Sequence, residues 1–455
     1  MSTVVPDSTT SLAPPGPDLA GLESELRAQL GDRGVSIELA ARERASLDGS
    51  RLSPVIGELL PLGLADLVAF AGDAEQIAAV VAAAVRHHVP VTPRGKGTGN
   101  YGQAIPMAGG LVLDMTRARA VVEVGDGWLT AEAGATMIAL EQAAGKSGQQ
   151  VLMYPSTAQS TIGGFLSGGS GGTGSIRHGS NSDGFVVALD VVHGDPEAAL
   201  VHVEGAAAQP YVHNYGTAGI IARATVRLEP LQDWRALYAS FDDFHGALSV
   251  IREIGDLEPT PRLVSADLAT LADALPPDPA IPAGRASLRA ILDASTLDAA
   301  TALVEGAGGR VEVVRDGAQA TTKVSMLSYN HPIEWLQKAY PHTYFHVEVS
   351  GHALVERIDE VHAVYPGGML HIEAQKGRPI GMLAGEYTSA EDVWAGFEKL
   401  TALGVGYHNC HQWFVDFQPD RTRELARVTD PQGLLNPGKL QPAAMVTVDT
   451  GAKVS

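Results

Sequence analysis

The chain has 455 residues and is 45% hydrophobic, so it can bury a large core, and its length predicts about two or three domains. Its 52 acidic residues outnumber 32 scattered basic ones, for a net charge of -20, so nucleic acid and anionic membranes are not expected partners. The single cysteine, Cys410, cannot form an internal disulfide, which fits a reducing compartment and favours the cytoplasm.

The first residues, "MSTVVPDSTTSLAPPGP", predict a disordered tail over residues 1–18 because Pro, Ser and Thr dominate them. They have neither a basic region nor an apolar region of an export signal. No segment of the chain reaches the roughly 20 apolar residues that a membrane span needs. We therefore expect no membrane span, and the first helix should lie in "LAGLESELRAQLG", residues 19–31.

Residues 66–91, "DLVAFAGDAEQIAAVVAAAVRHHVPV", predict a strand, a helix and a second strand. The helix is indicated by Ile77, Val80, Val81 and Ala84, which share one face at helical spacing. Glycine then dominates up to residue 184, between Val-rich predicted strands such as "LVLDM" and "FVVALDVVHG".

After Pro230 the pattern changes to strands alternating with helices, which predicts an α+β domain with an antiparallel sheet. The predicted strands are "ASLRAILDAS", "RVEVV", "YFHVEVSG" and "MLHIEAQKG". The predicted helices are "LDAATALVEGA" and "HALVERIDEVHAVY".

The segment "RGKGTGNYGQ", residues 94–103, follows a predicted strand and spells G-x-G-x-x-G, the dinucleotide fingerprint. That fingerprint must open a helix, but Pro106 and two glycines follow, so no helix fits. A Walker loop fails as well, because Lys96 precedes glycine. The remaining interpretation is a nest of backbone N–H groups around an anion such as a pyrophosphate, with a run of surface turns as the alternative.

A second glycine-rich cluster spans residues 154–192 and cannot form a core alone, so a bound group should order it. Within it, "GGSGG" matches the G-x-S-x-G nucleophile elbow with Ser170 as nucleophile. The elbow needs a strand before it and a helix after it, and neither is predicted. A serine hydrolase is therefore a minor alternative.

Five ordered motifs resemble the FAD-binding domain of the vanillyl-alcohol oxidase and p-cresol methylhydroxylase superfamily, in its glycolate oxidase or D-lactate dehydrogenase-like branch. They are "PRGKGTG", "PSTAQSTIGG", "GGSGGTGSIRHG", "YGTAGII" and "DPQGLLNPGKL". The resemblance implies an α+β protein with a p-cresol methylhydroxylase-type FAD-binding domain of two α/β subdomains over residues 19–232. It also implies a substrate or cap domain over 233–418 and a C-terminal segment, 419–445, that returns to the first domain.

The resemblance also implies which residues hold the cofactor, from the pyrophosphate through the ribityl chain and flavin ring to the adenine end. Those for the pyrophosphate are Pro93, Arg94, Gly95, Lys96, Gly97, Thr98, Gly99 and Asn100. Those for the phosphates, ribityl chain and ring side are Pro155, Ser156, Thr161, Ile162, Gly163, Gly164, Gly168, Gly169, Gly171, Gly172, Ser175, Ile176, His178 and Gly179. Gly219, Ile220 and Ile221 would meet the adenine end, and Asn436 and Lys439 would return to the flavin.

Two departures from the family limit what can be carried over. Members that bond FAD covalently from the first loop carry histidine where Thr98 stands, so we expect dissociable FAD. The metal-associated GHxGDGNxH signature is absent, so substrate and catalytic residues do not transfer. No metal is expected, because His408, Cys410 and His411 lack the spacing of a metal site.

Catalytic candidates come from pattern instead. Strand alternation places His346 on one polar face, and His371 and Glu373 on another, where each lines a substrate pocket or meets solvent. A base that titrates near neutrality favours histidine, and His331 and His411 are the first choices, with a structural histidine as the alternative for each. Arg378 is a candidate for binding a substrate carboxylate, or is a surface arginine.

The sequence thus predicts an FAD-dependent oxidoreductase that oxidises a small hydroxy acid, alcohol or phenol by hydride transfer to flavin N5. Oxygen or another acceptor would reoxidise the flavin. A flavin-binding module without catalysis and a hydrolase using Ser170 are the alternatives. The oligomeric state stays open, with a homodimer as one option.

Overall fold

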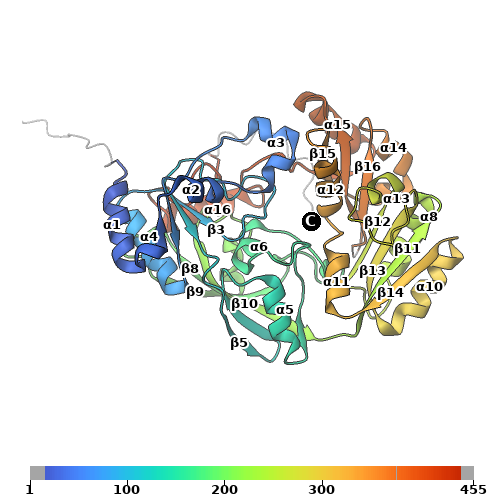
Figure 1. Ribbon diagram of the computed structural model, residues 1–455, viewed down its shortest axis with the longest axis horizontal. Helices are drawn as coiled ribbons and strands as arrows, with labels where there is room; N and C mark the ends of the chain where they lie inside the picture. The colour runs from blue at the N-terminus through green and yellow to red at the C-terminus, as the bar shows by residue number, and fades with distance from the viewer. Residues whose placement is uncertain (1–15, 376, 442–455) are drawn as a thin grey trace, which may run out of the picture.

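The computed structural model describes residues 16–375 and 377–441, which fold into two lobes (Figure 1). The first lobe holds residues up to 230 and the C-terminal segment from 419, and the second holds residues 234–408. Residues 1–15 of the predicted tail and 442–445 of the predicted C-terminal segment lie outside the described residues. Within the described ranges, none of the helices combines the length and hydropathy needed to cross a bilayer.

The first sheet of the first lobe confirms the predicted strand, helix and strand of residues 66–91. Ile77, Val80, Val81 and Ala84 are fully buried, and the helix begins where Asp73 accepts a hydrogen bond from Gln76 N. The two flanking strands are parallel, with another strand between them in the order β1-β2-β4-β3. The elements are α1 (Leu19–Leu30), β1 (Val35–Ser36), α2 (Leu39–Ala45), α3 (Pro54–Leu59), β2 (Leu67–Phe70), α4 (Ala74–Arg86), β3 (Val91–Arg94) and β4 (Leu111–Asp114).

The second sheet carries the glycine-rich region. Before this sheet begins, residues 101–110 form no helix, as predicted, and lead into β4 of the first sheet. The strand order is β5-β6-β10-β8-β9, with β7 also paired to β10. The elements are β5 (Val121–Gly125), β6 (Trp128–Glu132), α5 (Met137–Gly145), β7 (Gln149–Val151), α6 (Ile162–Gly168), α7 (Ser175–His178), β8 (Val186–Val192), β9 (Leu200–Glu204) and β10 (Ile220–Pro230).

The second lobe is one antiparallel sheet of eight strands, in the order β14-β11-β13-β12-β16-β17-β15-β18. The four predicted strands are confirmed as β13, β14, β15 and β16, whereas β11, β12, β17 and β18 were not predicted. Their bounds are β11 (Trp234–Phe241), β12 (Leu263–Asp267), β13 (Ala286–Asp293), β14 (Arg310–Asp316), β15 (Tyr344–Ser350), β16 (Met369–Glu373), β17 (Ile380–Glu386) and β18 (Gly406–His408).

Helices cover both faces of this sheet, but unequally. The apolar sides of β15 and β16 pack against one group of helices, which confirms the predicted alternation: α8 (Phe244–Gly255), α10 (Leu297–Gly306), α13 (Ala353–Glu356), α14 (Ile358–His362) and α15 (Ala390–Ala402). The helix predicted over 352–365 is broken at Arg357, whose φ is -129° and ψ 36°. The opposite face, which looks toward the first lobe in Figure 1, carries α9 (Ala269–Ala272), α11 (Ala318–Ser325) and α12 (His331–Ala339).

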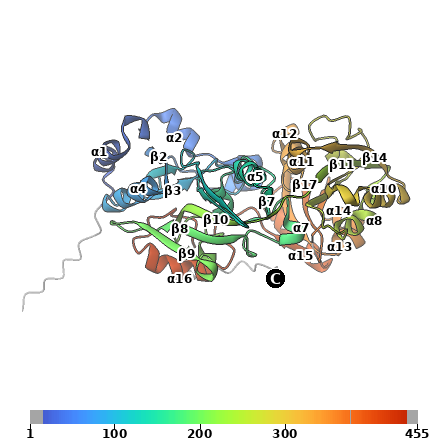
Figure 2. The ribbon, with the colours of Figure 1, turned by 90° about the horizontal axis from the view of Figure 1, so that it is seen from below.

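The two lobes share core residues. Val55 of α3 and Ile176 of α7 are 0% and 4% exposed and belong to the main core of the second lobe. Figure 2 shows α7 against that lobe. These two short helices therefore fix the first lobe against the sheet of the second.

The end of the chain returns to the first lobe, where α16 (Pro419–Thr429) lies beside β8 and β9 in Figure 2. Val91 N donates to Leu434 O at 2.8 Å, and Asn436 N donates to Val91 O at 2.7 Å. The C-terminal segment thereby extends the edge of the first sheet at β3, directly before the first glycine-rich loop.

Inside the second lobe, His371 neither lines an open pocket nor meets solvent, contrary to both expectations for it. It is fully buried, and its Nδ1 and Nε2 each lie 2.7 Å from a carboxylate, of Asp267 and Glu373. Arg289 also donates to Asp267. Against the effect of burial, the two carboxylates raise the pKa of His371 to about 9.

This histidine makes the stability of the second lobe depend on pH. Because its folded pKa lies above the unfolded 6.5, the stabilisation is complete below pH 6.5 and is lost as the pH rises through 9, at about 1.4 kcal/mol per pH unit. We expect the thermal unfolding midpoints of the native protein and of His371→Gln to converge as the pH rises from 6.5 to 9. A constant difference between the two midpoints, followed by calorimetry, would contradict this.

Candidate functional site

The two glycine-rich segments lie side by side in the first lobe. We call residues 93–100 the first ribbon and residues 155–179 the second ribbon. Thr98 Oγ1 and Ser160 Oγ are 2.8 Å apart, which joins the two ribbons directly. A Cβ atom on Gly95 would lie 2.1 Å from Thr161 Oγ1, so only glycine fits at this crossing.

The first ribbon presents unpaired donors. The backbone N–H groups from Lys96 to Asn100 donate no hydrogen bond to any other described residue, and Gly97 turns the ribbon with a φ of 63°. Arg94 Nη1 is buried and also has no partner within the described part of the chain. Burial lowers the pKa of Arg94, while Asp48 and Asp114 oppose that effect. Because a buried donor is normally paired, the unpartnered Nη1 of Arg94 beside these free backbone N–H groups fits a bound phosphate group.

The second ribbon is ordered by its own hydroxyl groups. Thr161 Oγ1 accepts from Gly164 N at 3.3 Å and caps α6, and Ser175 Oγ accepts from Gly172 N at 2.8 Å. A Cβ on Gly172 would lie 2.1 Å from a backbone oxygen. The predicted Ile176 faces the core of the second lobe, and His178 Nε2 lies 3.2 Å from Glu229.

The hydrolase alternative lacks its structural context. The helix α6, not a strand, ends at Gly168, the first glycine of "GGSGG", and the hydroxyl of Ser170 donates to Gly171 O at 3.2 Å. A nucleophile elbow would place this serine between a strand and a helix, beside a histidine. No hydrogen bond joins Ser170 Oγ to a histidine among the described residues.

The residues predicted to meet the adenine end use their side chains mainly for packing within the first lobe. Ile220 and Ile221 are each 1% exposed and pack in the two cores of the first lobe. Gly219 has a φ of 145° and lies against the ring of Tyr211. If this segment meets a nucleotide, it does so through its backbone.

Asn436 and Lys439 act on the loop that follows the first ribbon. Asn436 Nδ2 donates to Gln103 O at 3.0 Å and to Tyr215 O at 2.7 Å. Lys439 is fully buried, donates to Ile105 O at 2.8 Å, and burial lowers its pKa to about 7. Both side chains therefore support the loop that carries the ribbon.

The second lobe reaches the ribbons through residues 329–331. His331 Nε2 lies 2.9 Å from Thr157 Oγ1, and Tyr329 donates its hydroxyl hydrogen to Gly172 O. Burial lowers the pKa of His331, and its Nδ1 is buried without a partner in the described residues. Both contacts fall on the second ribbon.

Tyr101 makes the matching contact from the end of the first ribbon. Its hydroxyl donates to Glu348 Oε1 at 2.9 Å and accepts from Asn330 Nδ2 at 3.2 Å. Burial and the charge of Glu348 raise the pKa of Tyr101 well above its ordinary value, so the hydroxyl keeps its proton.

His346 on β15 is the most unusual of the predicted catalytic residues. It is 5% exposed, and neither ring nitrogen has a hydrogen-bond partner among the residues that the structure describes. Its ring centroid is 6.3 Å from that of Tyr101 and 6.0 Å from that of His411. Burial lowers the pKa of His346, so the imidazole is neutral at pH 7 with an unoccupied acceptor.

His411 lies beside His346, but one of its ring nitrogens already has a partner. His411 Nδ1 lies 3.2 Å from Ser53 Oγ, and burial together with His346 lowers its pKa to about 3. Arg378 makes no hydrogen bond or ion pair with the described residues. Its role as a carboxylate ligand stays a prediction.

Sequence reasoning missed a chain of charged contacts beside this site. Glu348 Oε2 lies 2.8 Å from His408 Nδ1, and His408 Nε2 bonds to Asp416. Asp416 also lies 3.4 Å from Nε2 of His213. Although burial opposes it, these carboxylates raise the pKa of His408 well above its ordinary value. Strand alternation could have found Glu348, which shares a face with His346, but no local pattern marked Asp416 or His213.

Comparisons with known proteins bear on the ribbons. Residues 65–203, which include the first ribbon and all of the second, match the family model described as an FAD binding domain. This segment is an FAD-binding domain of the p-cresol methylhydroxylase type. The unpaired donors of its first ribbon agree with a dinucleotide pyrophosphate as the group it holds.

The relatives each match this chain over less than half of its length. Glycolate oxidase subunit GlcD of Bacillus subtilis is 27% identical over 42% of this chain and 42% of its own length. D-lactate dehydrogenase of Archaeoglobus fulgidus is 26% identical over 40% and 43%. D-2-hydroxyglutarate dehydrogenase of Xanthomonas citri pv. viticola is 33% identical over 35% and 36%. The matched segment thus spans about two fifths of the length of these relatives.

The fold of both lobes is found in a solved structure. Alkyldihydroxyacetonephosphate synthase superimposes with a TM-score of 0.73 and 17% identity, over 96% of this chain and 88% of that one. At this identity the likeness concerns the fold: an FAD-binding domain joined to a second, α+β lobe.

The crossing of the ribbons yields a test of the FAD-binding domain. Gly95→Ala should push Thr161 off its helix cap and separate the ribbons, which weakens FAD binding at least about tenfold, or about 1.4 kcal/mol. Gly145→Ala, at the exposed end of α5, is the matched control, because a Cβ there meets nothing within 4 Å. Titration of the apoprotein with FAD measures both affinities, and equal affinities would contradict this assignment.

Proposed function

We propose that the protein is an FAD-dependent oxidoreductase that oxidises a small hydroxy acid, alcohol or phenol. The observation that carries this proposal is the first ribbon, whose backbone donors and Arg94 Nη1 lack partners among the described residues. A hydroxy acid is the favoured substrate because of the names of three relatives: a glycolate oxidase subunit, a D-lactate dehydrogenase and a D-2-hydroxyglutarate dehydrogenase.

The first ribbon would hold the pyrophosphate of FAD, and the second ribbon would hold the ribityl chain and flavin. When bound, FAD would supply the hydride acceptor, with oxygen or another compound as the final oxidant. Residues of both lobes meet at this place, since Tyr101, Asn330 and His331 contact one another or the ribbons. The substrate would therefore bind between the lobes.

His346 is the proposed base that accepts the proton of the substrate hydroxyl. Both of its nitrogens are unpaired within the described residues, whereas one nitrogen of His331 and one of His411 already contacts a hydroxyl. Its lowered pKa keeps it neutral, which is the form that accepts a proton.

Tyr101 is the proposed positioning residue for the substrate. Its single hydroxyl hydrogen is donated to Glu348, so the oxygen offers only a lone pair to further groups. A substrate hydroxyl could donate to this lone pair or to a ring nitrogen of His346. The ring centroids of Tyr101 and His346 are 6.3 Å apart. The ion pairs of Glu348 and His408 hold the tyrosine in this orientation.

Anaerobic bleaching of the flavin by a panel of hydroxy acids and alcohols tests the function. With a substrate found, His346→Gln should slow flavin reduction about 100-fold or more while FAD content is unchanged. In the native protein the rate of flavin reduction should not change with pH above 6.5. It should fall as the pH drops through the lowered pKa of His346, because the base is then protonated.

His245→Gln is the control, because this exposed side chain pairs, within the described part of the chain, only with Asp359 on the outer surface of the second lobe. A yellow protein whose flavin no panel member bleaches would favour a flavin-binding module without catalysis. A variant at His346 that reduces flavin at the native rate would leave His331 as the base.

We further infer that FAD is held without a covalent bond. The hydroxyl of Thr98, at the position of the covalent histidine in related proteins, is engaged with Ser160 at 2.8 Å. Precipitation of the purified protein with trichloroacetic acid should release all yellow colour into the supernatant. Colour that stays in the pellet would contradict this.

A further inference from the structure

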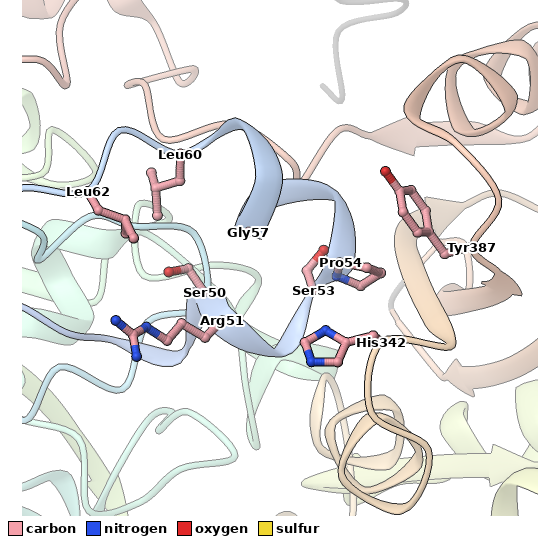
Figure 3. Close-up of a pocket in the computed structure, with 9 residues that line it drawn as sticks. All are labelled: Ser50, Arg51, Ser53, Pro54, Gly57, Leu60, Leu62, His342 and Tyr387. Carbon is pink, nitrogen blue, oxygen red and sulfur yellow. The ribbon is translucent and has the colours of Figure 1, made fainter.

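A cavity of about 480 Å³ opens between the lobes, on the side of α3 (Figure 3). One wall is the 3-10 helix over Gly49–Leu52, with α3 and the residues that follow it. The other wall is formed by His342 and Tyr387 of the second lobe. Because both lobes contribute, the cavity exists only where they dock.

The lining of the cavity is largely apolar. Pro54, Leu60 and Leu62 line the first-lobe wall, and a Cβ on Gly57 would meet nothing within 4 Å. Leu62 is 61% exposed, so an apolar ligand that covered it would bury hydrocarbon surface. The wall therefore suits a hydrocarbon.

The cavity also carries a cation without a counterion. Arg51 lines it, is exposed, and forms no ion pair or hydrogen bond with any described residue. Acidic residues outnumber basic ones by 52 to 32 in the chain, so an unpaired arginine at a cavity stands out. A guanidinium in this place favours an anionic group such as a carboxylate.

One residue connects the cavity to the candidate catalytic residues. Ser53 lines the cavity, and its hydroxyl lies 3.2 Å from Nδ1 of His411. The His411 ring is in turn 6.0 Å from the ring of His346. A ligand that touches Ser53 would thus be linked to His346 through the ring of His411.

We propose that this cavity binds the body of an amphipathic carboxylate, with the hydrocarbon against Pro54, Leu60 and Leu62 and the anionic group at Arg51. This deepens the proposed function and rests on it, since the ligand would be the substrate: a hydroxy acid whose hydroxyl lies at the opposite end of the hydrocarbon chain from the carboxylate. The volume lies within the range of roughly 300–1,000 Å³ that holds drug-sized ligands, far more than a two- or three-carbon acid fills.

Direct binding tests the cavity without turnover. The probes are decanoate, decanol and lactate, each titrated calorimetrically into the FAD-loaded protein. Decanoate should bind, lactate should not compete with it, and Arg51→Gln should weaken decanoate about tenfold while decanol is unaffected. Leu62→Ser should weaken both decanoate and decanol.

The matched controls lie on the neighbouring helix α2. Arg44→Gln removes an exposed arginine that forms no ion pair with the described residues, and Leu39→Ser removes a leucine that is 55% exposed. Both should leave decanoate binding unchanged. No decanoate binding, or equal losses in Arg51→Gln and Arg44→Gln, would overturn the proposed site.

A second measurement separates this inference from the proposed function. Bleaching of the flavin by 10-hydroxydecanoate, more efficiently than by lactate, would support the cavity as the substrate site. Bleaching by short hydroxy acids without decanoate binding would overturn the cavity and leave the oxidoreductase intact. Decanoate binding with no bleaching by 10-hydroxydecanoate would overturn the assignment of this substrate class.

Discussion

Backbone donors without partners are the constraint on which the rest of this structure depends. From Lys96 to Asn100 the first ribbon has little side chain to bury, and its N–H groups bond to no other described residue. The ribbon is held in place from outside: the second ribbon crosses it at Gly95, and Asn436 and Lys439 fix the loop that follows. A pyrophosphate offers the acceptors that these donors lack.

The two lobes are joined by first-lobe side chains that pack in the core of the second lobe. Val55 and Ile176 belong to the first lobe by sequence but pack in the core of the second, so the docking of the lobes is part of their folding. In the docked lobes His346 is 5% exposed, and neither of its ring nitrogens has a partner among the described residues. Desolvation lowers the pKa of this histidine, and a group placed there by tertiary packing becomes a neutral base.

Charge pairs surround this neutral centre. His371 is held between two carboxylates inside the second lobe, and His408 lies between Glu348 and Asp416 at the boundary. These histidines have raised pKa values, whereas those of His346 and His411 are lowered. The difference follows from partners rather than from burial, because all four side chains are strongly desolvated.

The sequence by itself determined the local structure and the cofactor class. Periodicity over residues 66–91, the Pro and Gly after residue 103 and the alternation around His346 all act between near neighbours, so they were readable without a fold. Only the tertiary structure decided which histidine is unpaired, since the partners of His331, His371 and His411 come from residues far away in the chain. It also joined Arg51 and Ser53 to Tyr387 around one cavity, because such contacts leave no pattern in either segment.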